Sequence, residues 1–431
     1  MGASDVDRTR LFAALRYRNF RIWFFAQLLS LIGTWMQNVA TSWLMFEMTR
    51  SRLALGMLSF ASTLPMLVLM LPAGAVADRL PRRQLLMGIQ AALMIQAFAL
   101  AGLAAVGILQ PWHLVVWGAW WGVANSFDVP TRHALVVELV DDRRVWMNAI
   151  ALNSLIFNLA RVIGPALAGF TLAILGPAWC FTLNGVSFMV VIGGLLAMTG
   201  TTFRPSRRPP PLRHQMVEGI RYVWHHSMLR MLIALTATAA FFGIAYITLL
   251  PAYAAEVLHL RETGYGLLNT GVGVGAMTGA LIVAAMYRSR RRIQLLQAGS
   301  FGVPLAMIAL ALCRHRLPAA GILFLAGLAF VLQFATTNTL IQSIVLDRLR
   351  GRVMSIYMLM IFGMTPFGAL LAGFIAQMLG LSLGLALSGI VALVMIFSLW
   401  IAHRGVWTVE PWPVTEDYDS ITTTATATER W

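Results

Sequence analysis

The sequence predicts an all-α integral membrane protein with twelve transmembrane helices in two six-helix halves. Of the 431 residues, 59% are hydrophobic and only 11% are charged, whereas a soluble protein carries about a quarter charged residues. The apolar residues fall in runs that reach the roughly 20 residues one helix needs to cross a bilayer. A stretch rich in proline and arginine separates the first six runs from the last six.

Each apolar run predicts one helix, and the charged or proline-rich breaks between runs set the helix ends. The predicted spans are 22–46, 54–77, 85–107, 113–137, 146–174, 179–200, 230–256, 265–287, 293–313, 319–345, 353–379 and 382–402. They define an N-terminal six-helix bundle (1–200), a cytoplasmic linker (201–229) and a C-terminal six-helix bundle (230–404). The tail, 405–431, is polar and threonine-rich, which predicts a disordered cytoplasmic segment.

Arginine placement predicts the orientation in the membrane. All 32 basic residues are arginine. With the N-terminus inside, 25 of them flank the cytoplasmic side, five lie on the opposite side and two lie within spans. The positive-inside rule therefore predicts a multi-pass protein of the bacterial inner membrane with both termini in the cytoplasm. Because the net charge of +15 comes from these short clusters, we expect no nucleic-acid partner.

The linker contains one amphipathic stretch, "LRHQMVEGIRYVW". In one interpretation its apolar positions lie at the membrane interface and its polar positions face water. The apolar positions are Val217, Ile220, Tyr222 and Trp224, and the polar ones are Arg213, Glu218 and Arg221. The other interpretation, which we favour, is a solvated linker between the halves.

The two halves resemble each other. A shift of 204 positions superimposes Gly164 on Gly368 and Gly169 on Gly373. Parallel repeats of this kind are typical of one large class of transporters. The repeat therefore favours a transporter over a membrane enzyme.

Spans 4 and 5 hold the charged residues that lie away from span ends. Span 4 contains Asp128 and Arg132, and span 5 contains Arg161. A charge near mid-bilayer costs about 2.5–3.5 kcal/mol on insertion scales, so each should pair or line a wet cavity. Asp128 and Arg161 lie at similar depth, which allows a pair between them. Three roles stay open for this set: a permanent ion pair, proton coupling through Asp128, or contact of Arg161 or Arg132 with an anionic substrate.

Enzyme and cofactor motifs are absent from the sequence. It has no GxxxxGK[ST] loop for ATP and no HExxH motif for zinc. The two cysteines, Cys180 and Cys313, are too few for a disulfide framework or a zinc site. We therefore expect no enzymatic activity, no cofactor and no metal.

Several motifs resemble those of the major facilitator superfamily. "GAVADRLPRR" is similar to the signature of its loop between spans 2 and 3, and "RVIGPALAG" is similar to the glycine–proline motif of its drug/proton antiporters. More narrowly, "FRIWFFAQLLSLIGTWMQNVATSWLMFEMTRS", "FDVPTRHALVVELV", "NAIALNSLIFNLARVIGPALAG" and "GRVMSIYMLMIFGMTPFGALLAG" resemble its enterobactin-exporter-like branch. Pro81 replaces a glycine that the loop signature often has, and the second-half counterpart "RSRRR" lacks the acid.

The resemblance implies roles for three groups of residues. The loop residues would form a conformational latch around Asp78, although its arginines could instead serve only as topology anchors: Gly74, Asp78, Arg79, Arg82 and Arg83. Small residues would form the interface where spans 5 and 8 meet, or else ordinary tight packing: Gly164, Pro165, Gly169, Gly271, Gly275 and Gly279. Polar and aromatic positions of spans 1, 7 and 10 would line the substrate cavity: Gln27, Trp35, Gln37, Asn38, Tyr246, Gln333 and Asn338.

The function implied by the resemblance is efflux by a secondary antiporter that acts through alternating access. The substrate would be a small amphiphile, as in siderophore export or multidrug resistance, and protons would drive its transport by a monomer. Two alternatives stay open: a non-transporting membrane binding or assembly protein, and a uniporter or importer of the same superfamily.

Overall fold

The computed structural model describes residues 12–199, 212–286 and 291–403, and every regular element in these ranges is a helix. The predicted tail 405–431 lies outside the described residues. The first half contains η1 (Ala13–Arg16), α2 (Arg18–Thr49), α3 (Arg52–Ala77), α4 (Arg82–Ala105), α5 (Pro111–Glu138), η2 (Arg143–Val145), α6 (Trp146–Leu175) and α7 (Pro177–Ala197). The second contains α8 (Leu212–His225), α9 (Ser227–Phe242), α10 (Ala245–Thr248), α11 (Leu250–Ala252), η3 (Tyr253–Val257), α12 (Glu262–Ala285), α13 (Arg292–Leu312), α14 (Arg316–Ile344), α15 (Asp347–Leu379) and α16 (Leu381–Ala402).

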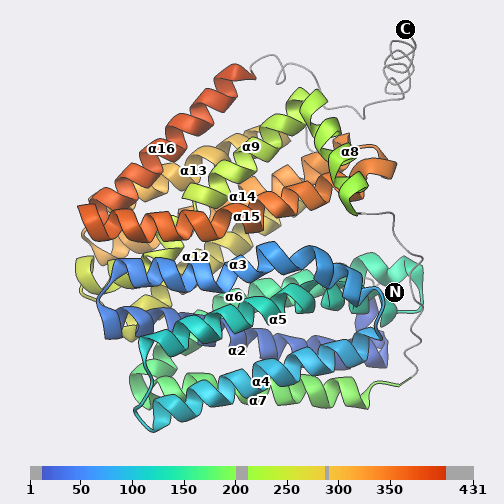
Figure 1. Cartoon of the computed structure of the whole chain (residues 1–431), viewed down its shortest axis with the longest axis horizontal. Helices are drawn as coiled ribbons and strands as arrows, with labels where there is room; N and C mark the ends of the chain where they lie inside the picture. The colour runs from blue at the N-terminus through green and yellow to red at the C-terminus, as the bar shows by residue number, and fades with distance from the viewer. Residues whose placement is uncertain (1–11, 200–211, 287–290, 404–431) are drawn as a thin grey trace, which may run out of the picture.

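Ten helical segments of the described residues are long and apolar enough to cross a membrane, with α9 through η3 forming one of them. The two predicted spans that fall short are α2 and α5, because polar and charged side chains such as Gln37 and Asp128 interrupt them. Both helices nevertheless lie within the same bundle as their apolar neighbours (Figure 1). The protein is thus an all-α, multi-pass membrane protein, and its count of twelve spans stays a prediction.

Two helix pairs make the most extensive contacts between the N-terminal and the C-terminal helices: α6 with α12, and α3 with α15. Figure 1 shows α3 and α15 side by side between the blue-green and the yellow-red sets. A Cβ added to Gly169 of α6 would lie 2.9 Å from the Glu262 oxygen, and one added to Gly373 of α15 would lie 2.8 Å from the Arg52 oxygen. Gly169 and Gly373, which the 204-position repeat relates, thus occupy equivalent close contacts between the two sets, whereas Gly164 and Gly368 approach α2 and α9 within their own sets.

The glycine stripe of α12 has a different partner from the one predicted. We expected Gly271, Gly275 and Gly279 to meet span 5, but all three face α14, and a Cβ on Gly275 would lie 1.9 Å from the Phe324 oxygen. The α12 glycines that contact α6 are Gly266 and Gly273, on another side of the helix. The spacing correctly predicted a close approach, but small residues on one helix do not specify which neighbour approaches.

The seventh predicted span is broken into short pieces. α9 ends at Phe242, and α10, α11 and the π-helical segment η3 follow in sequence. Such π-helical turns occur frequently at functional sites. Here the break places Tyr246 and Glu256 on irregular backbone that faces the N-terminal helices.

The linker helix α8 packs against α15 and α9. Tyr222, which the interfacial interpretation places at the membrane surface, is instead fully buried, and Glu218, which that interpretation places in water, forms an ion pair with Arg352. Val217, Ile220 and Trp224 are exposed, as the interfacial interpretation requires. Arg213 is the second residue of the helix, and its side chain lies outside the described part.

Candidate functional site

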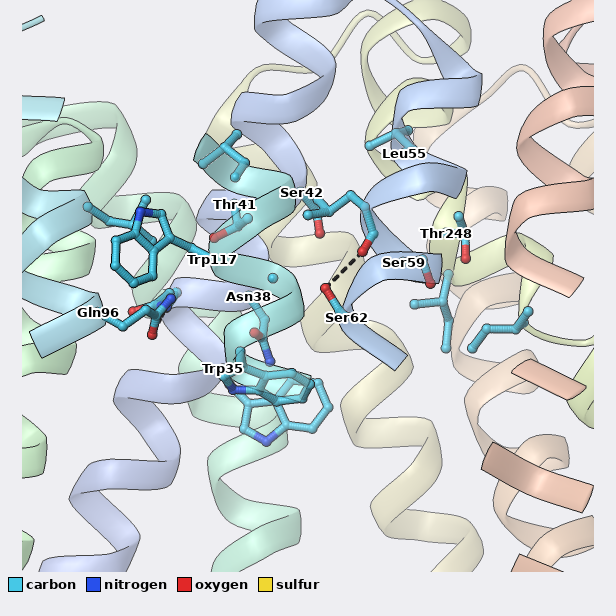
Figure 2. Close-up of a pocket in the computed structure, with 18 residues that line it drawn as sticks. Trp35, Asn38, Thr41, Ser42, Leu55, Ser59, Ser62, Gln96, Trp117 and Thr248 are labelled. Carbon is cyan, nitrogen blue, oxygen red and sulfur yellow. Dashed lines mark hydrogen bonds between the residues drawn. The ribbon is translucent and has the colours of Figure 1, made fainter. Parts of the chain in front are cut away.

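A cavity of about 250 Å³ lies between α2, α3, α4, α5 and the α10 region. Figure 2 shows Gln96 and Trp117 on one side of it, Ser59 and Thr248 on the other, and Trp35 and Asn38 from α2. Of the residues that we predicted to line a cavity, Trp35, Gln37 and Asn38 do so. Polar residues that sequence reasoning missed complete the wall: Thr41, Ser42, Ser59, Ser62, Gln96 and Thr248. Three indoles, Trp35, Trp117 and Trp121, provide the large apolar surfaces.

Buried amides support one wall of this cavity. Asn184 of α7 donates a hydrogen bond to Gln37 of α2 (2.8 Å), and Gln37 donates one to Gln96 of α4 (3.2 Å). Each amide is almost inaccessible to solvent, so these bonds offset the cost of burying polar groups. They also fix α2 between α4 and α7. Isolated amides in otherwise apolar spans were the available signal for Gln96 and Asn184.

Four other predicted cavity residues lie away from the cavity wall. Gln27 and Gln333 are buried, and the Gln333 amide donates to the Leu235 carbonyl oxygen of α9 at 3.1 Å. Asn338 accepts a hydrogen bond from Gln342 on its own helix. Tyr246 is buried between the cavity-lining residues Ile244 and Ile247, with no hydrogen-bond partner for its hydroxyl among the described residues.

Asp128 forms a buried charged cluster within the N-terminal helices. Only 2% of the residue is exposed. One carboxylate oxygen accepts a hydrogen bond from Gln90 of α4 at 2.9 Å, and the other forms an ion pair with Arg132 one turn along α5. A pair between Asp128 and Arg161, which their depth allowed, is not formed. Residues four apart on a helix lie next to each other on one face, so Arg132, rather than Arg161, pairs with the Asp128 carboxylate.

Arg161 lies on α6 without an acidic partner in the described part of the chain. Its guanidinium carbon is 5.8 Å from the centre of the Trp35 ring, within the range of a cation–π contact. Tyr246 of α10 lies within electrostatic range of the guanidinium. Arg161 therefore contacts Trp35 of the N-terminal helices and lies in the electrostatic neighbourhood of Tyr246 from the C-terminal helices.

The predicted latch residues lie at the end of the bundle where α3 meets α4, which we term the Asp78 end. Asp78 caps α3 through its backbone, and its carboxylate has no partner among the described residues, while Gly74 has open space around it and Arg79 is exposed. Arg82 forms an ion pair with Glu138 of α5 at 2.5 Å, and Arg83 donates to the Leu196 oxygen of α7. These arginine contacts stay within the N-terminal helices, so the acid of the motif does not engage the C-terminal helices in this conformation.

The opposite end of the bundle, which we term the Arg52 end, carries an ion pair that sequence reasoning missed. Arg52 at the start of α3 contacts Glu256 of η3 through two nitrogen atoms, at 2.6 and 3.1 Å. The same guanidinium donates to the Ala376 oxygen of α15 at 2.9 Å, and the Arg52 backbone N–H donates to the Gln377 side chain. Arg52 thereby joins the N-terminal helices to the C-terminal helices at three points.

Relatives with similar sequences span nearly the whole chain. The staphyloferrin A transporter of Staphylococcus aureus is 24% identical over 88% of this chain and 95% of its own length. The multidrug efflux pump Tap of Mycolicibacterium fortuitum is 28% identical over 85% and 93%. The enterobactin exporter EntS of Citrobacter koseri is 26% identical over 84% and 86%.

A solved structure supports the fold. A bacterial homologue of the human lysosomal transporter Spinster, in an inward-facing and unoccupied conformation, has a TM-score of 0.73 at 14% identity and covers 93% of this chain and 99% of its own. The family described as transmembrane secretion effector matches residues 9–413. The chain therefore belongs to this transporter family of the major facilitator superfamily.

Proposed function

We propose that the protein is a proton-coupled exporter that moves a small amphiphile, a siderophore or a drug-like compound, by alternating access. The observation that carries this proposal is the combination of an amphipathic cavity with a buried carboxylate on one of its wall helices. Trp121 lines the cavity, and Asp128 lies seven residues further along α5, roughly 10 Å at 1.5 Å per residue. The names of the similar relatives support efflux of siderophores or drugs.

The proposed orientation places the Asp78 end in the cytoplasm and the Arg52 end outside. The distribution of 25 arginines against five supports it, because cytoplasmic flanks are enriched in basic residues. Both termini then lie in the cytoplasm of the bacterial cell. A single chain supplies both sets of helices around the cavity, so we propose that the monomer is the transporting unit.

The contacts at the two ends support alternating access. At the Arg52 end, an ion pair, two further hydrogen bonds and two glycine contacts hold the N-terminal and C-terminal helices together. At the Asp78 end, the Asp78 carboxylate has no partner among the described residues. We propose that the conformation described is closed to the outside, and that Asp78 engages the C-terminal helices only in the opposite state.

Purified protein in liposomes should move at least one siderophore or amphiphilic dye when a pH gradient is imposed. Uptake into inside-out oriented vesicles is the measurement, and a protonophore that dissipates the gradient should abolish it. Movement that survives the protonophore would favour a uniporter. If no compound moves while the protein binds one of them, the non-transporting binding or assembly protein becomes the better reading.

Replacing Arg52 with glutamine should increase the population that is open to the outside. The ion pair with Glu256 is partly shielded, with 23% and 29% of the two side chains exposed, so its loss is expected to shift the equilibrium by about 1 kcal/mol, roughly fivefold. Labelling of a cysteine placed at the cavity residue Ser42 by a membrane-impermeant thiol reagent measures this shift, with Cys313 replaced by serine. The exchanged pair Arg52→Glu with Glu256→Arg should restore slow labelling. Equal labelling of all three proteins would show that the ion pair does not hold this end closed.

A further inference from the structure

Arg161 is a cation within the helix bundle whose charge no acidic side chain of the described residues neutralises. Among the described residues it has no ion pair, and its side chain donates no hydrogen bond. The other charged residues of this region, Asp128 and Arg132, neutralise each other. An uncompensated charge inside a membrane protein is costly, so its presence calls for a charge supplied from outside the protein.

The Trp35 ring contacts the Arg161 guanidinium, and Tyr246 from the other helix set lies within electrostatic range of it. Trp35 of α2 lies beneath it at 5.8 Å and also lines the cavity. Tyr246 of α10 is 1% exposed, and its hydroxyl makes no hydrogen bond within the described part of the chain. A buried hydroxyl without a partner loses free energy that a hydrogen-bonding ligand would restore. A cation and an unused donor thus lie together beside the cavity.

We propose that Arg161, Tyr246 and Trp35 form a subsite for the anionic group of the transported compound. A guanidinium presents a planar fork of N–H donors that fits a carboxylate, or a comparable oxyanion, through two parallel hydrogen bonds. The Tyr246 hydroxyl would donate a third, and the Trp35 ring would contact the apolar part of the same molecule. This inference rests on the proposed export function and adds to it the substrate class, amphiphiles that carry a carboxylate or similar oxyanion.

The placement of this subsite gives the anion a role in the conformational change. Arg161 belongs to α6 and Tyr246 to α10, on the two sides that must move relative to each other. An oxyanion bound to both would connect the two sets of helices directly. A neutral ester would keep only weaker, uncharged hydrogen bonds to these groups, so it would enter the same cavity and favour closure around itself much less.

Binding of a matched pair of probes to the whole solubilised protein tests the subsite. The probes are a xanthene dye with a free carboxylate and the methyl ester of the same dye, titrated by fluorescence anisotropy. The wild-type protein should prefer the carboxylate. Arg161→Gln should weaken carboxylate binding roughly 10- to 100-fold and leave the ester unchanged, since a hydrogen-bonded charge contributes on that scale. Tyr246→Phe should weaken carboxylate binding by less, and Arg161→Lys should recover part of the loss.

The control for the loss of an arginine is Arg316→Gln, because Arg316 is exposed at the start of α14. It should bind both dyes as the wild-type protein does, and thermal unfolding of every variant should be recorded alongside. Equal binding of the two dyes by the wild-type protein, or an equal loss of both in Arg161→Gln, would overturn the subsite. Neither result affects gradient-driven transport of the ester dye, whereas failure of the export proposal would appear as no gradient-driven movement of either dye.

Discussion

Replacing Asp128 with asparagine should abolish efflux driven by a pH gradient while the protein still reaches the membrane. The substitution keeps the size of the side chain and its contact with Gln90, but it replaces the carboxylate of the Asp128–Arg132 pair with an amide that cannot carry a proton. Because only 2% of Asp128 is exposed, proton exchange with water requires the bundle to change conformation. In the proposed mechanism, that requirement would couple proton movement to alternating access.

Loss of Asp128 alone also leaves Arg132 as an unpaired buried cation, which by itself destabilises proteins by about 3–5 kcal/mol. The double variant Asp128→Asn with Arg132→Gln separates the two effects. If Asp128 carries the proton, the double variant should fold as well as the wild type and still fail to use the gradient. If the pair only supports the fold, removing both charges should restore gradient-driven efflux.

Efflux should be measured in vesicles with an imposed pH gradient and, in parallel, as exchange of labelled against unlabelled compound at equal pH. Exchange requires the conformational change but no net proton movement. The double variant should therefore retain exchange within a few-fold of wild type and lose net accumulation by roughly 100-fold or more, the scale on which removal of an essential proton carrier acts. Accumulation by the double variant at the wild-type level would exclude Asp128 as the coupling group.

The sequence predicted how deep in the membrane each charged residue lies, but it did not predict which residues they contact. Depth follows from counting residues at a constant rise along a helix, which placed Asp128 and Arg161 at one level. Partner choice depends also on the rotation of each helix, which the sequence does not specify. In the structure Gln90 of α4 and Arg132 bind the Asp128 carboxylate, and Arg161 instead lies over the Trp35 ring.

The sequence likewise predicted some of the residues that line the cavity and missed others. Span 1 carries several amides in an apolar background, and that signal correctly predicted Gln37 and Asn38 in the wall. Ser59 and Ser62 of α3 were missed, because serine is also tolerated in lipid-facing helices where it bonds to its own backbone. The break at α10 that buries Tyr246 was missed as well, since residues 230–256 read as one continuous apolar run.

The Arg52–Glu256 ion pair could not be predicted from the sequence, for a more general reason. The two residues are 204 positions apart, and each lies at a span end, where an isolated charge predicts only topology. Their contact depends on how the two helix sets meet, and that is decided by backbone approach at Gly56, Gly169, Gly266 and Gly373. The repeat identified two of these glycines as equivalent, without showing what either one touches.

Substituting alanine at both Gly169 and Gly373 should reduce transport by roughly 10- to 100-fold. A Cβ on Gly169 would lie 2.9 Å from the Glu262 oxygen and 3.1 Å from the Gly266 Cα, and one on Gly373 would lie 2.8 Å from the Arg52 oxygen and 3.0 Å from the Gly56 Cα. These neighbours are backbone atoms, so no side chain can rotate away and the helices must separate. Overpacking of this kind costs about 1–3 kcal/mol per site.

The overpacking destabilises the conformation in which the Arg52 end is closed, because in the proposed cycle these helix contacts form only in that conformation. The double alanine variant should therefore increase labelling of the cysteine at Ser42 from outside, in the same direction as Arg52→Gln. Gly193→Ala on α7 is the matched control, since nothing lies within 4 Å of its Cβ, and alanine is the better helix former. If both effects act on one equilibrium, combining Gly169→Ala with Arg52→Gln should add their free energies until the labelled state predominates. Gly373→Ala and Arg52→Gln should not add in this way, because Arg52 is itself a neighbour of Gly373. Transport equal to that of Gly193→Ala would mean that these helix pairs do not approach as closely during the cycle as they do here.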